Sequence, residues 1–163
     1  FDVLRGERVA LSGGNGSGKS SLLKLILGED IKKTGTISIG SGLIISYVSQ
    51  DTSHLSGTLS DYASQCRIDE SLFKAILRKL DFERIQFTKD MAQFSGGQKK
   101  KVLIAKSLCE QAHLYLWDEP LNFIDIYSRM QIEQLILDFR PTMIFVEHDR
   151  AFRETIATKT LEL

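Results

Sequence analysis

The amino-acid sequence predicts an α/β fold built around a largely parallel sheet. Short apolar runs, of the kind found in buried strands, alternate with segments whose apolar residues recur at helical spacing. A glycine-rich segment lies between the first apolar run and the first helical segment. The 163 residues suffice for one α/β domain with its own core, and not for two.

The first third of the chain is expected to hold a strand, a helix and a hairpin. Arg8–Leu11 is rich in β-forming residues and stops at a loop of glycines. Helical periodicity begins at Lys19 and ends before Gly28, a residue suited to the position after a helix. Thr36–Ile39 and Leu43–Val48 are predicted as two strands joined by a Gly-Ser-Gly turn.

The rest of the chain alternates helices with buried strands. Residues 52–94 show helical patterns and no convincing strand, so we expect a helical subdomain there, inserted into a core of residues 1–51 and 95–163. Thr58 is expected to cap the first helix of this insertion. The predicted strands are Leu114–Trp117, Met143–Val146 and Thr158–Leu163, and the apolar helical stripes are Leu72-Phe73-Ile76-Leu77-Leu80, Val102-Ala105-Cys109 and Ile132-Leu135-Ile136-Phe139, the last ended by Pro141.

The composition excludes several classes of protein. Apolar residues make up 42% of the chain, as in soluble globular proteins, and no apolar run approaches the roughly 20 residues of a membrane span. The 21 lysines and arginines are balanced by 21 acidic residues, so no overall basic field indicates nucleic acid. Cys66 and Cys109 lie outside any metal-ligand spacing and favour a reducing, cytoplasmic setting. The start at Phe1, without a signal-peptide pattern, indicates a fragment of a longer chain or a chain lacking its first residues.

The glycine-rich segment has the composition of a phosphate-binding loop. It fits the pattern G-x-x-x-x-G-K-[ST] between a strand and a helix. Glycines allow backbone N–H groups to curl round a phosphate, and the start of a helix presents a positive dipole end to it. A glycine-rich turn with an incidental lysine is the alternative. The candidate nucleotide-binding residues are Gly13, Gly14, Asn15, Gly16, Ser17, Gly18, Lys19, Ser20 and Ser21, with Lys19 reaching the β- and γ-phosphates and the Ser20 hydroxyl ligating Mg²⁺.

Two carboxylates follow the buried strand Leu114–Trp117. Ligands of open parallel sheets bind beyond the carboxyl ends of the strands. Asp118 is therefore a candidate Mg²⁺ ligand, and Glu119 a candidate base for an attacking water. An acidic turn ended by Pro120 is the alternative, but the phosphate loop upstream favours the functional interpretation. Gln50 and His148 also follow predicted strands, although each taken alone would be an ordinary loop residue.

A second anion-binding candidate opens the helix after residue 95. Gly96 and Gly97 expose backbone N–H groups at a helix start, while Ser95 could simply cap that helix. Three lysines, Lys99–Lys101, follow in the first turn, where they oppose the helix dipole. Such a run is usually a solvated face, but a nearby anion would explain it better.

These pieces, in this order, resemble the nucleotide-binding domain of ABC ATPases over essentially the whole chain. Gly13–Ser20 resembles its Walker A motif, Gln50 its Q-loop, Leu114–Asp118 with Glu119 its Walker B motif and catalytic carboxylate, Leu121–Asp125 its D-loop, His148 its switch histidine, and Ser95, Gly96, Gly97 and Gln98 its signature motif. The resemblance implies an α/β P-loop NTPase fold, ATP with Mg²⁺ as ligands, and Ser20, Gln50 and Asp118 around the metal. It also implies that two such domains enclose two ATP molecules, so that Ser95 and Gly97 contact the nucleotide held by the partner domain, in the same chain or in a homodimer.

Within this superfamily the sequence resembles the ABC-F class. Glu119–Asp125 is similar to the E-P-x-N-x-x-D segment of that class, and His148–Arg150 to its H-D-R. The short insertion between Gln50 and Ser95 fits as well. ABC-F proteins carry two such domains in one soluble chain without membrane spans and act on the ribosome, and some protect it from antibiotics. The resemblance therefore implies a ribosomal partner and no direct membrane insertion.

Three departures and two alternatives accompany this resemblance. Phe94 replaces the usual leucine before Ser95, and Glu147 replaces a small hydroxyl residue before His148, adding a negative charge near the γ-phosphate that would weaken the switch contact. The resemblance further implies that the N-terminal strands of the full domain, with the aromatic residue expected to stack on adenine, would lie before Phe1, so no residue here is assigned to the base. The alternatives are the motor subunit of a membrane transporter, whose insertion would normally be longer, and a scaffold that binds ATP without turnover, against which the intact Glu119 and His148 argue.

Overall fold

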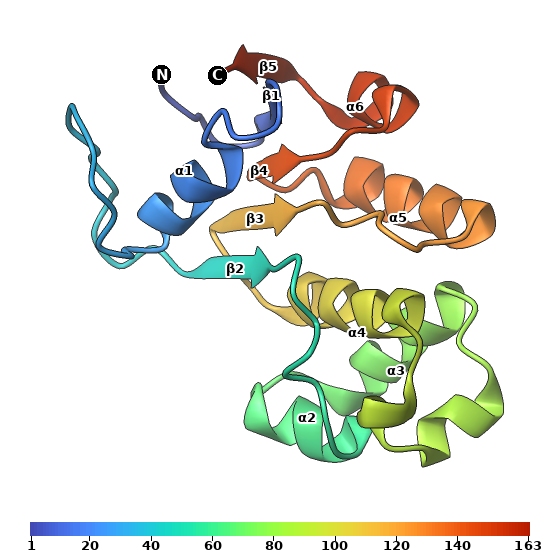
Figure 1. Cartoon of the computed structure of the whole chain (residues 1–163). Helices are drawn as coiled ribbons and strands as arrows, with labels where there is room; N and C mark the ends of the chain where they lie inside the picture. The colour runs from blue at the N-terminus through green and yellow to red at the C-terminus, as the bar shows by residue number, and fades with distance from the viewer.

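The computed structural model describes residues 1–163 as five parallel strands covered by helices on both faces (Figure 1). The sheet order is β2-β3-β4-β1-β5, and every pair of neighbouring strands is parallel. The elements are β1 Arg8–Ser12, α1 Lys19–Ile26, β2 Ile45–Val48, α2 Leu59–Gln65, α3 Glu70–Lys79, η1 Arg84–Thr88, η2 Met91–Gln93, α4 Gly96–Cys109, β3 Leu114–Asp118, α5 Ile126–Phe139, β4 Met143–Val146, α6 Arg150–Ile156 and β5 Lys159–Glu162.

The two faces of the sheet bury separate apolar clusters because side chains alternate along each strand. In β4, Ile144 and Val146 pack with Leu23 and Ile26 of α1. Met143 and Phe145 of the same strand join the larger cluster of 24 residues, which includes side chains of α2 to α6. All four residues of β4 are fully buried, which explains its continuous apolar sequence.

The segment 52–94 contains only helices, and its helix starts follow the expected capping chemistry. The Thr58 hydroxyl accepts a hydrogen bond from the backbone N–H of Asp61 at 3.1 Å, as predicted. Phe73, Ile76, Leu77 and Leu80 bury the predicted stripe of α3, whereas Leu72, at its edge, is 47% exposed.

The helix α5 ends where proline predicts. Arg140 takes a left-handed conformation before Pro141 (φ +48°), and the helix stops at Phe139. Ile132 and Ile136 of its stripe are buried, but Phe139 is 67% exposed because the last turn extends beyond the core.

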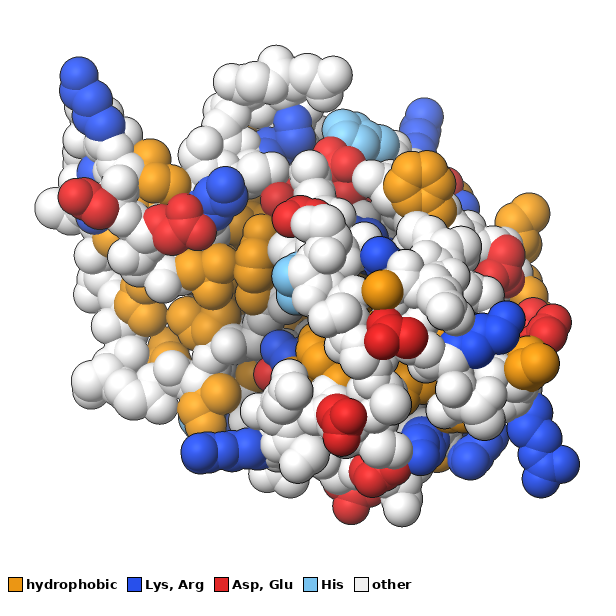
Figure 2. All heavy atoms as spheres, turned by 60° about the horizontal axis from the view of Figure 1, so that its bottom comes forward, with side chains coloured by type: hydrophobic (Ala, Val, Ile, Leu, Met, Phe, Trp, Pro, Cys, Tyr) orange, Lys and Arg blue, Asp and Glu red, His pale blue; other side chains and the backbone are white.

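The hairpin predicted for residues 36–48 does not form. Only Ile45–Val48 is a strand, and it pairs with β3 rather than with Thr36–Ile39. Ile37, Ile39, Leu43 and Ile44 are all at least 37% exposed, and Figure 2 shows hydrophobic side chains gathered on this side of the molecule. Ile45–Val48 is held by its pairing with β3, whereas the turn-proximal residues Leu43 and Ile44, which would begin the pairing with Thr36–Ile39, lie outside the sheet, where a two-stranded ribbon is marginal.

Candidate functional site

The phosphate-loop candidate closes around its own lysine. Lys19, the first residue of α1, is 8% exposed, and its Nζ donates to the carbonyl oxygens of Gly13 and Gly14 at 2.9 and 2.8 Å. A Cβ on Gly13 would lie 2.6 Å from both the Leu163 carbonyl and the Ser17 hydroxyl, so only glycine fits there. The loop thus fixes a buried cation at its centre.

The start of α1 is free to attract an anion. Gly18 caps the helix in a left-handed conformation (φ +98°) and offers no side-chain hydrogen bond to the first-turn N–H groups. No acidic residue lies in the first turn to neutralise the helix dipole. Unsatisfied N–H groups and the positive dipole end therefore point out of the loop, as in helix N-termini that bind phosphate.

Gln50 and Asp118 meet because β2 and β3 are neighbours in the sheet. The Gln50 Nε2 donates to the Asp118 Oδ1 at 3.1 Å. Asp118 is only 2% exposed at the end of β3, and Gln50 follows β2 on an exposed turn. Burial, and after it the negative charge of Asp118, raises the pKa of Tyr47 to about 12.

Glu119 and His148 form a second pair at the next strand ends. The His148 Nε2 lies 2.9 Å from the Glu119 Oε1, and the Asn122 Nδ2 donates to Oε2 at 2.8 Å. Burial raises the pKa of Glu119, but the bonds from Asn122 and His148 and the charge of Lys100 outweigh it, so the pKa lies below its ordinary value. The backbone of Glu119 has a positive φ (+49°), an uncommon conformation for this residue type.

One cavity is lined both by the phosphate loop and by the residues that follow β4. It has a volume of about 300 Å³ and is lined by Gly13, Gly14 and Lys19 together with Glu147 and His148, among others. The predicted signature residues are not among those that line it. The helix α4, which they open, packs in the larger cluster, on the opposite face of the sheet from α1.

The signature candidate is a helix start with a capping box. The Ser95 Oγ accepts from the Gln98 backbone N–H at 3.2 Å, and the Gln98 Oε1 accepts from the Ser95 N–H at 2.9 Å. Ser95 and Gly96 remain exposed. A Cβ on Gly97 would lie 2.4 Å from the Phe123 carbonyl oxygen, so this glycine permits the close approach of the loop after β3.

Two of the three lysines in the run Lys99–Lys101 of α4 are buried, so the run is not a solvated face. Lys100 is 2% exposed and donates to the carbonyl oxygens of Ser49 and Gln50 at 2.8 and 3.3 Å. Lys101 is 8% exposed and pairs with Asp125 at 2.8 Å. Burial lowers the pKa of Lys100, and surrounding carboxylates, led by that of Asp118, offset part of this effect.

Lys100 was not predicted as part of the site, although the spacing of the apolar residues that follow it indicates that it lies on a buried face of the helix. Ile104 and Leu108 follow it at spacings of four and eight residues, and both are buried, so all three side chains share one helix face. The predicted stripe of Val102, Ala105 and Cys109 covers another face of the same helix. A helix buried on more than one side places its lysine inside, where it needs backbone acceptors.

The donor chemistry fits magnesium held jointly with phosphates. No cluster of three His, Cys, Asp or Glu side chains could hold a metal ion by itself. Mg²⁺ in nucleotide sites is typically bound by one or two protein oxygen ligands plus substrate phosphates. The buried Asp118 carboxylate and its contact Gln50 match that requirement.

Comparisons with known proteins give the family. The ABC transporter family model matches residues 1–122. ATP-binding protein Uup of Caulobacter vibrioides is 34% identical over 170 residues, covering 99% of this chain and 28% of Uup. ABC transporter F family member 2 of Arabidopsis thaliana is 32% identical (99% of this chain, 25% of that protein), and ribosome protection protein VmlR of Bacillus subtilis is 30% identical (99% and 30%).

Solved structures agree with the predicted fold. The RNase-L Inhibitor superposes with a TM-score of 0.83 at 26% identity, over 98% of this chain and 32% of that one. The predicted P-loop NTPase fold with a parallel sheet is thereby confirmed. The chain spans less than a third of the length of each of the three curated relatives named above. None of its helices combines the length and the apolar character needed to cross a bilayer. The chain belongs to the ABC transporter family, and its named relatives include members of the F class.

Proposed function

We propose that this chain binds Mg·ATP and hydrolyses it, working face to face with a second ABC domain. The observation that carries the proposal is the gathering of three devices at the carboxyl ends of adjacent parallel strands. These devices are the loop around Lys19, the Gln50–Asp118 pair and the Glu119–His148 pair. Ligands of open α/β sheets bind at this edge.

Each device has a role in phosphoryl transfer, which depends on positioned charges and donors. The loop N–H groups and Lys19 hold the β- and γ-phosphates. Ser20, Gln50 and Asp118 supply oxygen ligands for Mg²⁺, which when bound neutralises charge on the phosphate oxygens. The loop residues bind and orient the phosphates through hydrogen bonds and charge, without forming a covalent bond to them.

The Glu119 carboxylate is the proposed acceptor of the proton from the attacking water. Its lowered pKa favours the ionised form, which is the form that accepts a proton, and also makes this carboxylate a weaker base. His148 contacts the same carboxylate and is the proposed hydrogen-bond partner of the γ-phosphate. Because the two side chains touch, a shift of His148 changes the position of the base.

The partner domain completes the site. Ser95, Gly96, Gly97 and Gln98 lie outside the cavity that Lys19 and His148 line, so we assign them to the nucleotide held by the partner. One domain alone then offers half of the γ-phosphate contacts and should turn ATP over slowly. Hydrolysis by the isolated chain should rise more than linearly with its concentration, or be restored by the complementary domain. A monomer whose specific activity is independent of dilution would contradict this assignment.

Action on the ribosome, in the cytoplasm, is the proposed cellular role. Similarity to a ribosome protection protein of Bacillus subtilis and to an F-family member of Arabidopsis thaliana supports it. Protection of the ribosome from an antibiotic is the narrower form of this proposal. The motor subunit of a membrane transporter is the alternative, and flanking membrane-spanning segments in the same gene or operon would select it.

Lys19→Ala and Glu119→Gln in the full-length protein test the chemistry. We expect Lys19→Ala to weaken ATP binding about 10- to 100-fold in calorimetric titration, because a charge-assisted contact is lost. Lys24→Ala, on the exposed side of the same helix, is the matched control and should bind normally. Glu119→Gln should bind ATP but slow single-turnover hydrolysis on the order of 100-fold. Unchanged affinity in Lys19→Ala, or a normal rate in Glu119→Gln, would remove that residue from its role.

The slow Glu119→Gln variant also tests the cellular role. With ATP it should co-sediment with ribosomes, and with ADP it should not, because only the ATP state holds the two domains together. Co-sedimentation with membrane vesicles and not with ribosomes would select the transporter alternative.

A further inference from the structure

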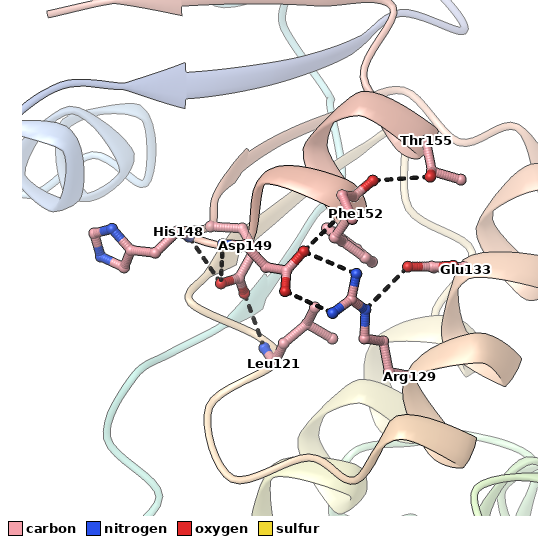
Figure 3. A network of polar contacts seen from close by, with 9 residues as sticks. Leu121, Arg129, Glu133, His148, Asp149, Phe152 and Thr155 are labelled. Carbon is pink, nitrogen blue, oxygen red and sulfur yellow. Dashed lines mark hydrogen bonds and ion pairs between the residues drawn. The ribbon is translucent and has the colours of Figure 1, made fainter.

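A single buried carboxylate joins the loops that follow β3 and β4. Glu147 is 6% exposed. Its Oε2 accepts a hydrogen bond from the Leu121 backbone N–H at 3.1 Å, and its Oε1 accepts from those of His148 and Asp149 at 2.8 and 3.3 Å. Figure 3 shows these bonds converging between Leu121 on one loop and His148 and Asp149 on the other.

The loop after β4 is anchored independently on its other side. Both oxygens of Asp149 accept from Arg129 of α5, at 2.5 and 2.8 Å, and Oδ1 also caps α6 by accepting from the Phe152 N–H at 2.9 Å (Figure 3). Arg129 bonds Glu133 as well, at 3.1 Å. This loop is therefore fixed to two helices, and Glu147 is its tie to the loop that carries Leu121.

The charge of Glu147 is satisfied by backbone donors rather than by an ion pair. No lysine or arginine nitrogen lies within 4.0 Å of it, although Lys100 acts on the same region electrostatically. Burying a carboxylate is expensive unless hydrogen bonds compensate it, and three N–H donors do so here. Because the donors come from two loops, the compensation exists only while both loops stay in place.

Both loops carry residues of the proposed reaction. Glu119 lies two residues before Leu121, and its carboxylate contacts the His148 ring at 2.9 Å. Phe123, two residues after Leu121, packs against Gly96 and Gly97 at the start of α4. The tie made by Glu147 therefore sits between the base, the histidine and the segment that faces a partner domain.

We propose that Glu147 is a positioning residue that makes these two loops move as one unit. In a chain with a small side chain at this position, no side-chain bond of this kind would transmit a displacement of the loop around Phe123 to His148. With Glu147 present, such a displacement also moves His148 and its contact with Glu119. The inference rests on the proposed roles of His148 and Glu119 in hydrolysis.

Glu147→Gln and Glu147→Ala in the full-length protein test the tie. A glutamine amide keeps one acceptor oxygen and turns an NH₂ donor toward the other loop, so it can hold one loop and not both. Alanine holds neither. Glu154→Gln, a 62% exposed carboxylate of α6, is the matched control.

Hydrogen exchange of the backbone amides gives a readout that does not depend on activity. We expect the Leu121 or the His148 amide to exchange at least about tenfold faster in Glu147→Gln, and both in Glu147→Ala, with no change in β3 and β4. Faster exchange throughout the domain would mean that Glu147 only stabilises the fold. Unchanged exchange at both amides would overturn the proposal.

Kinetics test the consequence. At saturating ATP, Glu147→Gln should lower the single-turnover rate roughly tenfold, which is less than the roughly 100-fold lost on removing a general base, because here the base is displaced and not removed. If Glu147 acts through His148, adding Glu147→Gln to His148→Ala should slow the reaction little further. Fully additive losses would overturn the proposal. If the unmodified protein hydrolyses no ATP, the proposed function fails, and the exchange measurement alone decides whether the tie exists.

Discussion

Adding one methyl group at Gly97 should destabilise the domain, whereas adding it at the neighbouring Gly96 should not. A Cβ at Gly97 would lie 2.4 Å from the Phe123 carbonyl oxygen and 3.3 Å from its carbonyl carbon. At Gly96 the nearest atom is a Phe123 ring carbon at 3.5 Å, which is an ordinary contact. The two substitutions are chemically identical and one residue apart, so each controls for the other.

The magnitude follows from how little the loop can yield. Relieving the contact at Gly97 requires a movement of about 1 Å to reach ordinary separation. Phe123 already has a positive φ (+64°), and Leu121 is held by Glu147, so the backbone resists that movement. Overpacking of this kind costs about 1–3 kcal/mol, while replacing a helical glycine by alanine gains up to about 1 kcal/mol. We therefore expect Gly97→Ala to be less stable than Gly96→Ala by about 2 kcal/mol.

Urea unfolding followed by tryptophan fluorescence measures this difference. Trp117 is the only tryptophan and is 1% exposed, so its emission reports the unfolding of the core. With a slope of about 2 kcal/mol per molar urea, the two midpoints should differ by about 1 M. Midpoints that coincide within about 0.2 M would refute the reasoning, since they would show that the loop at Phe123 moves freely.

Two further predictions concern charged side chains around α4. Burial raises the pKa of Asp125, but the bonds from Lys101 and Ser128 outweigh it and hold the pKa well below its ordinary value. A carboxyl group whose pKa is lowered by folding stabilises the fold at pH values above its ordinary pKa near 4. This stabilisation is lost as the pH falls toward the pKa of the folded state. Asp125→Asn keeps the helix cap and loses the half-exposed Lys101–Asp125 ion pair, so it should lower the free energy of unfolding by only about 1 kcal/mol at pH 7. The difference in urea midpoint between the unmodified protein and the variant should narrow below about pH 4. A difference that does not depend on pH would contradict this prediction. Lys100→Met should change stability by less than about 1 kcal/mol, because the hydrogen bonds lost by the Ser49 and Gln50 carbonyls are offset by the removal of a buried charge. It should nevertheless slow ATP turnover in the full-length protein, since the Gln50 carbonyl loses its donor; a normal rate would exclude Lys100 from positioning the loop after β2.

The sequence alone determined the fold class and most of the elements. Strands buried on both faces require continuous apolar runs, so Met143–Val146 is recognisable without any knowledge of its neighbours. The phosphate loop is equally local, because its glycines and Lys19 act through backbone geometry within a few residues. The end of α5 before Pro141 follows from sterics of adjacent residues alone.

Long-range pairing decided the rest. The order β2-β3-β4-β1-β5 brings Asp118 beside Gln50 and Glu119 beside His148, and nothing in the separate segments fixes which strands become neighbours. The predicted hairpin at residues 36–48 is wrong for the same reason, because Ile45–Val48 pairs with β3, from a distant part of the chain, and the local pattern does not indicate that partner. Glu147 shows the point most clearly. Its position in the sequence indicated only an added charge near a phosphate. In the structure its carboxylate accepts a hydrogen bond from the backbone N–H of Leu121, which lies 26 residues earlier in the chain and comes close to Glu147 only in the folded sheet.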